Sequence, residues 1–447
     1  MDSYNVVIDD SMIQNIIKTD MAESVDLISL KMVLYIIVLG VLPSIFVYKV
    51  NINYAPVKQE IISRLKLSLL SLGMLLSVIL FLSNFYASFF REHKPLRYYT
   101  NPTYYIYSAG KYINRLFKKA SIPLKRIGLD AVLSSTDIQR ELIVLVVGEA
   151  ARADRFALNG YSRDTNPLLQ QKQDIISFSN FWSCGTSTAI SLPCMFSIYG
   201  QSKFTNQKGD STENLLDILQ RAGINVLWRD NNSDSKGVAL RVPYQDYKTS
   251  KTNPVCDPEC RDEGMLSGLQ QYIDVHQKGD IFILLHQMGN HGPAYYKRYP
   301  SIFEKYTPTC KTNQLEDCTN EEIGNAYDNA ILYTDYFLSK VIDFLETNNA
   351  KFETAMFYIG DHGESLGENG LYLHGLPNII APDAQKHIPF IMWFGESFDK
   401  EEINFTNLKG KIKNKYSHDN IFHTILGLME VKTSVYMEEM DIIDHNE

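Results

Sequence analysis

The feature that most constrains this chain is a pair of long uncharged apolar segments near its N-terminus. Met32 to Tyr48 contains no charged side chain, and the apolar stretch extends back to Leu27 with Lys31 as its only interruption. Leu67 to Phe90 is also free of charge. A helix needs about 20 apolar residues to cross the bilayer core, so both segments predict transmembrane helices. Buried core helices are the alternative, but they seldom run so long without a charge.

Basic residues fill the segment between the two predicted spans. They are Lys49, Lys58, Arg64 and Lys66, against Glu60 as the single acidic residue. Basic loops stay in the cytoplasm by the positive-inside rule, so we expect residues 27–90 to form two spans joined by a short cytoplasmic loop. Both ends of the chain are then expected on the opposite side of the membrane.

The first residues do not resemble a signal peptide. The chain begins Met1-Asp2-Ser3, without a basic region followed by an apolar one. The predicted topology nevertheless requires residues 1–26 to be exported, and we expect them to form an amphipathic helix. We therefore expect further spans upstream of this sequence.

Charge gives no sign of nucleic-acid binding. The chain of 447 residues has 43 basic and 52 acidic side chains and a net charge of −9. Binding to nucleic acid favours a concentrated basic face, which this balance does not provide.

Six cysteines occur in three close pairs, all after the predicted spans. We expect the pairs to form disulfides Cys184–Cys194, Cys256–Cys260 and Cys310–Cys318, although spacing alone does not choose among the pairings. A zinc knuckle is the alternative for the second pair, but no matching pair of cysteines lies beside it. Disulfides point to an oxidising compartment outside the cytoplasm.

Strands and helices alternate after Arg140. The predicted strands are 142–147, 224–228, 281–285, 355–359 and 388–394, and the predicted helices are 212–222, 263–276 and 319–348. This alternation predicts an α/β fold over residues 141–447, with a mostly parallel sheet sandwiched by helices. Residues 91–140 are basic and rich in tyrosine, whose rings settle at the headgroup level, and we interpret them as a membrane-surface linker.

Three of the predicted strands run into polar clusters. Glu149 follows strand 142–147, His286 and His291 follow strand 281–285, and Asp361, His362 and His374 follow strand 355–359. An isolated acid after a strand is usually a helix cap. Three clusters at the carboxyl edge of one sheet are instead a typical ligand site, and their carboxylates and imidazoles suit zinc.

A nucleophile is expected between Ser183 and Cys194, where hydroxyl side chains precede an apolar helix. A helix N-terminus and a metal would both stabilise an alkoxide there. An ordinary N-cap is the alternative interpretation. Spacing alone does not choose among Thr186, Ser187 and Thr188.

These segments resemble the phosphoethanolamine transferases of the alkaline-phosphatase superfamily, which include the lipid A-modifying and mobile colistin-resistance enzymes. The resemblance lies in residues 147–152, 159–161 with 165–167, 184–197, 286–293 and 360–374. Sulfatases of the superfamily carry Cys-x-Pro-x-Arg at the nucleophile, and neither Cys184 nor Cys194 begins that motif. Family members have five spans, so this chain resembles a transferase without its first three.

The resemblance implies a role for particular residues. Thr188 is implied as the phosphorylated nucleophile. The implied zinc ligands are Glu149, Thr188, Asp361 and His362. His286, His291 and His374 match histidines around the substrate phosphate or a second, weaker zinc.

Two further groups are implied in substrate binding. Asn232, Ser233 and Lys236 match positions near the bound headgroup. Asn15, Thr19 and Glu23 recur every fourth residue, which places them along one side of a helix, and they match the family's lining of the phosphatidylethanolamine cavity. A solvated polar stripe is the alternative for that helix.

The implied enzyme is a monomer in the bacterial inner membrane with its catalytic domain in the periplasm. It transfers phosphoethanolamine from phosphatidylethanolamine to a lipid, with lipid A as the leading acceptor, through a phosphothreonine. Such transfer confers resistance to cationic peptides such as polymyxin. The alternatives are a hydrolase or phosphoglycerol transferase with the same metal site, and an inactive lipid-binding membrane protein.

Overall fold

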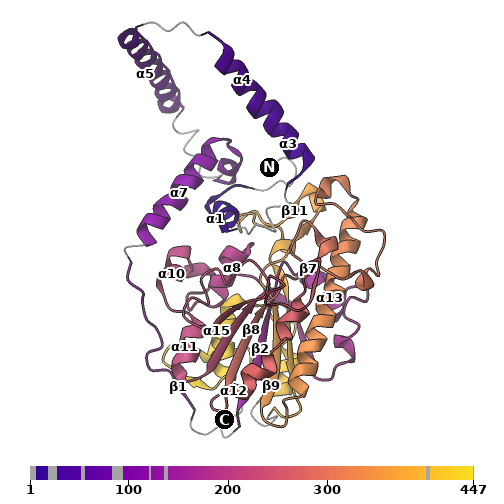
Figure 1. Ribbon diagram of the computed structural model, residues 1–447. Coiled ribbons are helices and arrows are strands. Elements are labelled where there is room, and N and C mark those ends of the chain that lie inside the picture. Colours follow the sequence, from indigo (N-terminus) through magenta and orange to yellow (C-terminus); the bar gives the residue numbers. More distant parts are fainter. Residues whose placement is uncertain are drawn as a thin grey trace. The chain divides into compact units, whose positions relative to one another are not determined.

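The structure is a computed structural model that describes residues 7–18, 28–51, 56–82, 94–119, 122–134, 139–398 and 403–445. The chain divides into two compact units (Figure 1). One comprises Leu27–Tyr104, and the other comprises Met1–Asp26 together with Tyr105–Glu447. Each unit is described by itself below.

The smaller unit contains two long apolar helices, as predicted. The first runs over Leu30–Lys49 with a mean hydropathy of 2.3, and comprises α3 (Leu30–Tyr35), a π-helical segment (Ile36–Val41) and α4 (Leu42–Lys49). The second, α5 (Val57–Phe81), has a mean hydropathy of 1.8. Neither helix buries a side chain, so both present apolar surface, as a membrane span does. Helix α5 begins before the predicted Leu67, and its first turns carry Lys58, Arg64 and Lys66, which we expected in the loop. The predicted end of the second span, residues 83–90, lies outside the described residues.

The larger unit is built on an eight-stranded sheet in the order β13-β3-β12-β9-β2-β8-β4-β5. The strands are β13 (Tyr416–Ser417), β3 (Ile175–Trp182), β12 (His387–Phe394), β9 (Glu353–Gly360), β2 (Glu141–Gly148), β8 (Ile281–His286), β4 (Asn225–Asp230) and β5 (Tyr244–Asp246). Only β12 runs antiparallel to its neighbours, so the sheet is mostly parallel, as predicted.

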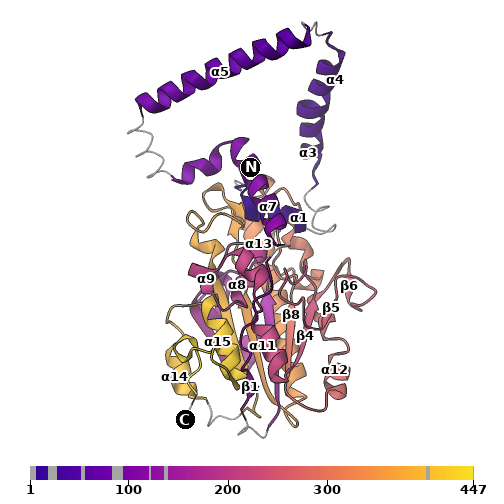
Figure 2. The ribbon, with the colours of Figure 1, turned by 90° about the vertical axis from the view of Figure 1, so that its left-hand side faces the viewer.

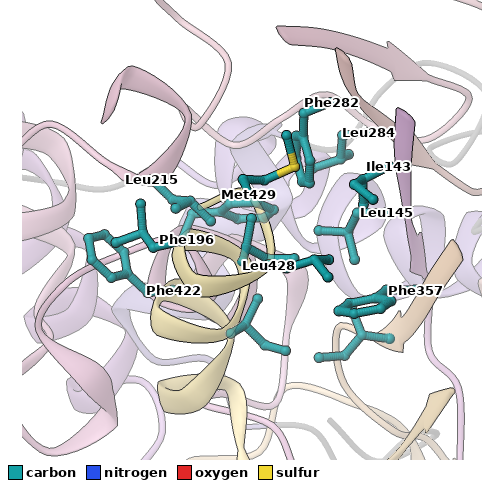
Figure 3. Close-up of a cluster of buried hydrophobic side chains, with 14 of the residues drawn as sticks. Ile143, Leu145, Phe196, Leu215, Phe282, Leu284, Phe357, Phe422, Leu428 and Met429 are labelled. Carbon is teal, nitrogen blue, oxygen red and sulfur yellow. The ribbon is translucent and has the colours of Figure 1, made fainter. Parts of the chain in front are cut away.

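Helices cover both faces of this sheet. The face that carries Ile143 and Leu145 of β2 packs against α8 (Thr188–Met195), α11 (Leu215–Ala222) and α15 (His418–Leu428), as Figures 2 and 3 show. The opposite face packs against α12 (Leu269–Val275) and α13 (Asn320–Glu346). Every residue of β2 is buried, and after Glu141 its residues 142–147 form one continuous apolar run.

Local signals explain where several helices begin and end. Thr319 and Glu322 form the predicted capping box at the start of α13, with both reciprocal hydrogen bonds present. The predicted helix over 263–276 is instead split into a 3-10 helix (Asp262–Leu266) and α12. Gly268 between them has a φ of +72°, and this left-handed conformation interrupts a right-handed helix.

Shorter elements complete the larger unit. They include α1 (Asp10–Lys18), α7 (Thr103–Lys119, in this unit from Tyr105 on), α9 (Gly200–Lys203), α10 (Asn206–Ser211), α14 (Phe405–Gly410) and the two-stranded pairs β1 (Val132–Leu133) with β14 (Val431–Lys432), β6 (Cys256–Asp257) with β7 (Glu259–Cys260), and β10 (Ser365–Leu366) with β11 (Tyr372–Leu373). Helix α7 occupies part of the segment that we interpreted as a linker.

All three predicted disulfides are present: Cys184–Cys194, Cys256–Cys260 and Cys310–Cys318. Cys256 and Cys260 are therefore not ligands of a zinc knuckle.

Candidate active site

The three predicted clusters meet at one edge because their strands are neighbours. Strands β9, β2 and β8 are adjacent and parallel, with Gly148 level with Gly360 and Val147 level with His286. The residues that follow each strand therefore emerge side by side at the carboxyl edge of the sheet.

Glu149, Asp361 and His362 form the centre of this edge. Their ligand atoms all lie within 4.8 Å of one another, and the three side chains are fully buried. His362 Nε2 lies 3.2 Å from Glu149 Oε1 and 3.4 Å from Asp361 Oδ2. Neither of these two oxygens accepts a hydrogen bond from the described residues.

The negative charge of the two buried carboxylates in the cluster favours a bound cation. Burial alone would lower the pKa of His362, but the charges of Asp361 and Glu149 outweigh it and raise that pKa to about 10. Burial, together with the charge of Glu149, raises the pKa of Asp361. Two buried carboxylates and an imidazole with convergent lone pairs are a fitting set of ligands for a divalent metal.

The Thr188 side chain reaches this cluster. Its Oγ1 donates a hydrogen bond to Glu149 Oε2 at 3.1 Å and lies 3.3 Å from His362 Nε2. Thr188 is also the first residue of α8, so its hydroxyl lies at the positive end of that helix.

The two rival hydroxyls are placed differently. Thr186 Oγ1 donates to the carbonyl of Leu376 at 2.6 Å, away from the cluster. Ser187 is the N-cap residue of α8, and its side chain makes no capping hydrogen bond. Of the three hydroxyls that the sequence left open, Thr188 alone is hydrogen-bonded to the cluster.

Histidines surround the cluster. The His374 ring centroid lies 4.2 Å from that of His362 and 6.1 Å from that of His291. His286 is fully buried and is held through Nδ1 by Asp230 Oδ2 at 2.9 Å. We refer to His286, His291 and His374 as the histidine rim.

The loop after β4 contributes polar side chains to the same edge. Asn232 Nδ2 donates to Glu149 Oε2 and to the carbonyl of Gln287, both at 2.8 Å. Lys236 is buried, and its Nζ donates to Ser233 Oγ at 2.5 Å and to the Ser233 carbonyl at 3.0 Å. The ammonium is thus held by Ser233, the residue that follows Asn232 in this loop.

Helix α1 packs against α8, which carries Thr188. Its Gln14 accepts a hydrogen bond from Asn206 Nδ2 at 3.1 Å, and the neighbouring Asn15 is half-buried. Thr19 and Glu23, the other two residues of the predicted donor-lipid triplet, lie outside the described residues.

Sequence reasoning missed two carboxylates behind the histidine rim. Asp230, the last residue of β4, accepts hydrogen bonds from Trp228 Nε1 at 2.8 Å and from His286. Glu364 Oε2 holds His374 Nδ1 at 3.2 Å. Both lie at the carboxyl edge of the sheet, and that position was the available signal.

Most of the chain matches known proteins and models of protein families. The family model "Phosphoethanolamine transferase EptA/EptB" matches residues 1–117, and the model "Sulfatase" matches residues 141–431. Phosphatidylethanolamine transferase Mcr-2 of Escherichia coli is 46% identical over 441 residues, which cover 96% of this chain and 80% of the relative.

Phosphoethanolamine transferase EptA of Salmonella typhimurium is 43% identical over 448 residues, which cover 99% of this chain and 81% of the relative. The solved structure of the integral membrane lipooligosaccharide phosphoethanolamine transferase A of Neisseria meningitidis is similar with a TM-score of 0.92 at 42% identity. That match covers 98% of this chain and 83% of the solved chain.

Proposed function

The chain belongs to the phosphoethanolamine transferase family, and on that premise we propose that it transfers phosphoethanolamine from phosphatidylethanolamine to lipid A through a phosphothreonine at Thr188. One observation carries the residue assignment. The Thr188 hydroxyl stands at the start of α8 and donates to Glu149 at 3.1 Å, within the buried carboxylate and imidazole cluster.

The names of the relatives support the donor and the kind of acceptor. Mcr-2 is a phosphatidylethanolamine transferase, and the Neisseria meningitidis enzyme acts on lipooligosaccharide. Lipid A is the membrane-embedded part of such glycolipids, and a chain with two apolar helices meets both lipids at the same bilayer surface. We place the enzyme in the bacterial inner membrane, with the disulfide-bonded domain in the periplasm.

Zinc is the metal that we assign to the cluster, with Glu149, Thr188, Asp361 and His362 as the residues that would hold it. Oxygen and imidazole nitrogen ligands in a compact group of four are the usual zinc environment. When bound, zinc lowers the proton affinity of a hydroxyl and stabilises negative charge on phosphoryl oxygens.

In the first half of the reaction, Thr188 Oγ1 attacks the phosphorus of phosphatidylethanolamine. The bond from Oγ1 to phosphorus forms, the bond from phosphorus to the glycerol oxygen breaks, and diacylglycerol leaves. Glu149 is a poor base for this step. Although burial opposes ionisation, the proximity and charge of His362 hold the pKa of Glu149 well below its ordinary value.

We therefore assign the proton transfers to the histidine rim, whose imidazoles surround the cluster. A rim histidine accepts the Thr188 proton, and another donates a proton to the departing glycerol oxygen. Asn232, Ser233 and Lys236 form the polar wall beside the phosphoryl group, where the buried ammonium of Lys236 favours negative charge.

In the second half, a phosphate oxygen of lipid A attacks the phosphorus carried by Thr188. The new oxygen–phosphorus bond forms and the bond to Oγ1 breaks. The rim returns a proton to Thr188, and the acceptor phosphate gives its proton to the rim histidine that protonated the glycerol oxygen. The product carries an added ammonium group, which weakens the attraction of lipid A for cationic peptides such as polymyxin.

Mass spectrometry of lipid A tests this function. Bacteria that express the full chain should carry lipid A heavier by one phosphoethanolamine group, and bacteria that express Thr188→Ala should not. Free phosphoethanolamine as the only product would identify a hydrolase. A glycerol phosphate adduct would identify a phosphoglycerol transferase, and a modified core sugar would replace lipid A as the acceptor.

A further inference from the structure

His418 connects the two loops that meet at the active site. It is the first residue of α15 and is fully buried. Its Nδ1 accepts a hydrogen bond from the backbone N–H of Cys184 at 3.1 Å, and its Nε2 donates to the carbonyl of Gly360 at 2.9 Å. One imidazole therefore bridges two backbone segments that are far apart in the sequence.

Each of these two peptide groups lies next to a residue of the reaction. Cys184 begins the loop that leads to Thr188, and its disulfide with Cys194 closes that loop around α8. Gly360 ends β9 and directly precedes Asp361 and His362. The bridge thus joins the segment that carries the hydroxyl to the segment that carries two members of the metal cluster.

The two backbone hydrogen-bond partners of His418 fix which of its ring nitrogens carries the hydrogen. A backbone N–H can only donate and a carbonyl can only accept, so Nδ1 must be bare and Nε2 must carry the hydrogen. Burial lowers the pKa of His418 to about 3, which agrees with a neutral ring. A leucine or an alanine at this position would make neither bond.

The surrounding fold holds His418 in place. Ser417 pairs with Trp182 at the end of β3, so the residue after each strand, His418 and Ser183, emerges at the same edge. Ser417 also caps α15 in a capping box with Asn420. The apolar face of α15 packs into the core through residues such as Ile421, which limits its movement.

We infer that His418 is a positioning residue that sets the distance between the Thr188 hydroxyl and the Asp361–His362 pair. This role rests on the proposed function of Thr188 and concerns the chemical step rather than donor binding. The wall of Asn232, Ser233 and Lys236 belongs to another loop, which follows β4. Loss of the bridge should therefore slow turnover without weakening donor binding.

The test compares His418→Leu with His423→Leu in the full chain in detergent micelles. His423 is a buried histidine of the same helix, and its Nδ1 accepts from the backbone N–H of Met437 at 3.2 Å, away from the active site. Steady-state release of diacylglycerol from phosphatidylethanolamine, with lipid A present as the acceptor, gives kcat and KM. Competition with a chromophoric chelator gives the affinity for Zn²⁺.

We expect His418→Leu to lower kcat by about 100-fold, the cost of a small misplacement of reacting groups, with KM unchanged. Its Zn²⁺ affinity should fall by about 10-fold or more, which is the usual effect of replacing a residue that positions metal ligands without binding the metal. His423→Leu should change neither quantity, although both variants lower the melting temperature. Equal kcat and equal Zn²⁺ affinity in the two variants would overturn the inference.

Two provisions keep the result decisive. If His418→Leu does not fold, His418→Asn and His418→Gln replace it, because each keeps one of the two hydrogen-bonding groups and should give an intermediate loss of kcat. If the unmutated chain releases no diacylglycerol, the proposed function fails. The difference in Zn²⁺ affinity between the His418 and His423 variants then still decides the role of His418.

Discussion

Thr188 Oγ1 lies 3.1 Å from Glu149 Oε2, although the two residues belong to different elements, the start of α8 and the end of β2. The hydroxyl is therefore already in contact with a buried carboxylate of the cluster of Glu149, Asp361 and His362. In the proposed zinc site, a small movement would let Thr188 complete the set of ligands.

Thr188 should carry the covalent intermediate. Enzyme trapped during turnover of phosphatidylethanolamine should gain the mass of phosphoethanolamine on the peptide that contains Thr188. Thr188→Ala should lose at least about 10³-fold in kcat while it keeps its fold, because the residual groups cannot form the intermediate. Thr186→Ala is the matched control and should still be modified. A phosphoethanolamine adduct on Thr186 in the unmutated enzyme would refute the assignment.

The purified chain should contain at least one tightly bound zinc ion, detectable by elemental analysis. Glu149→Gln removes a charged ligand. It should therefore lower Zn²⁺ affinity by more than roughly 10- to 100-fold, the loss expected when a residue that only hydrogen-bonds to a ligand is replaced. The control is Glu396→Gln, because Glu396 is exposed and its substitution leaves the cluster intact. Gln385→Glu is not a suitable control because Gln385 is buried. Full activity in the presence of chelator, with no zinc in the protein, would rule the assignment out.

Loss of the Cys184–Cys194 disulfide should harm activity more than loss of either other disulfide. This bond closes the segment that contains Thr188, whereas Cys256–Cys260 joins a small hairpin. Double serine variants of each pair, assayed for diacylglycerol release, give the comparison. Equal activity of the three variants would show that the bond does not brace the nucleophile.

Glu23 is predicted to bind the ammonium of the donor headgroup. Glu23→Gln should weaken transfer from membrane phosphatidylethanolamine because it removes a charge-assisted hydrogen bond. Hydrolysis of a small soluble phosphodiester should be unchanged, and it serves as the internal control. Transfer at the unmutated rate by the Asn15/Thr19/Glu23 triple alanine variant would show that these three side chains do not bind the donor.

Acid should destabilise the fold through a histidine of α15. Burial lowers the pKa of His423 from 6.5 to about 4. Between these values the unfolded chain binds a proton that the folded chain does not, so the free energy of unfolding falls as the pH is lowered. The slope is at most roughly 1.4 kcal/mol per pH unit.

The measurement is the melting temperature of the unmutated chain and of His423→Gln at about pH 7 and about pH 5. The variant lacks the titrating group and should lose less stability on acidification. Since loss of metal affects both proteins alike, it cancels in the comparison. Equal losses would show that His423 does not contribute.

Much of the fold follows from local sequence. The uncharged segments predicted both apolar helices, because length and lack of charge are properties of a single segment. The buried run in β2 and the capping box at Thr319 are equally local signals. The cysteine pairs were predicted because each bond closes a short stretch of chain. Strand β3 was missed because polar Ser177, Ser179 and Asn180 interrupt its apolar pattern.

The sequence by itself determined that acidic and imidazole groups gather at one sheet edge, because parallel neighbouring strands end together. It did not distinguish the hydroxyl of Thr188 from those of Thr186 and Ser187 by spacing. Only the tertiary structure points one of them at Glu149, since that direction depends on where α8 begins relative to β2. The hydrogen bonds of His418 and Asp230 could not be predicted for the same reason. Their partners lie up to 234 positions away, and only packing of the whole sheet brings such groups within hydrogen-bonding distance.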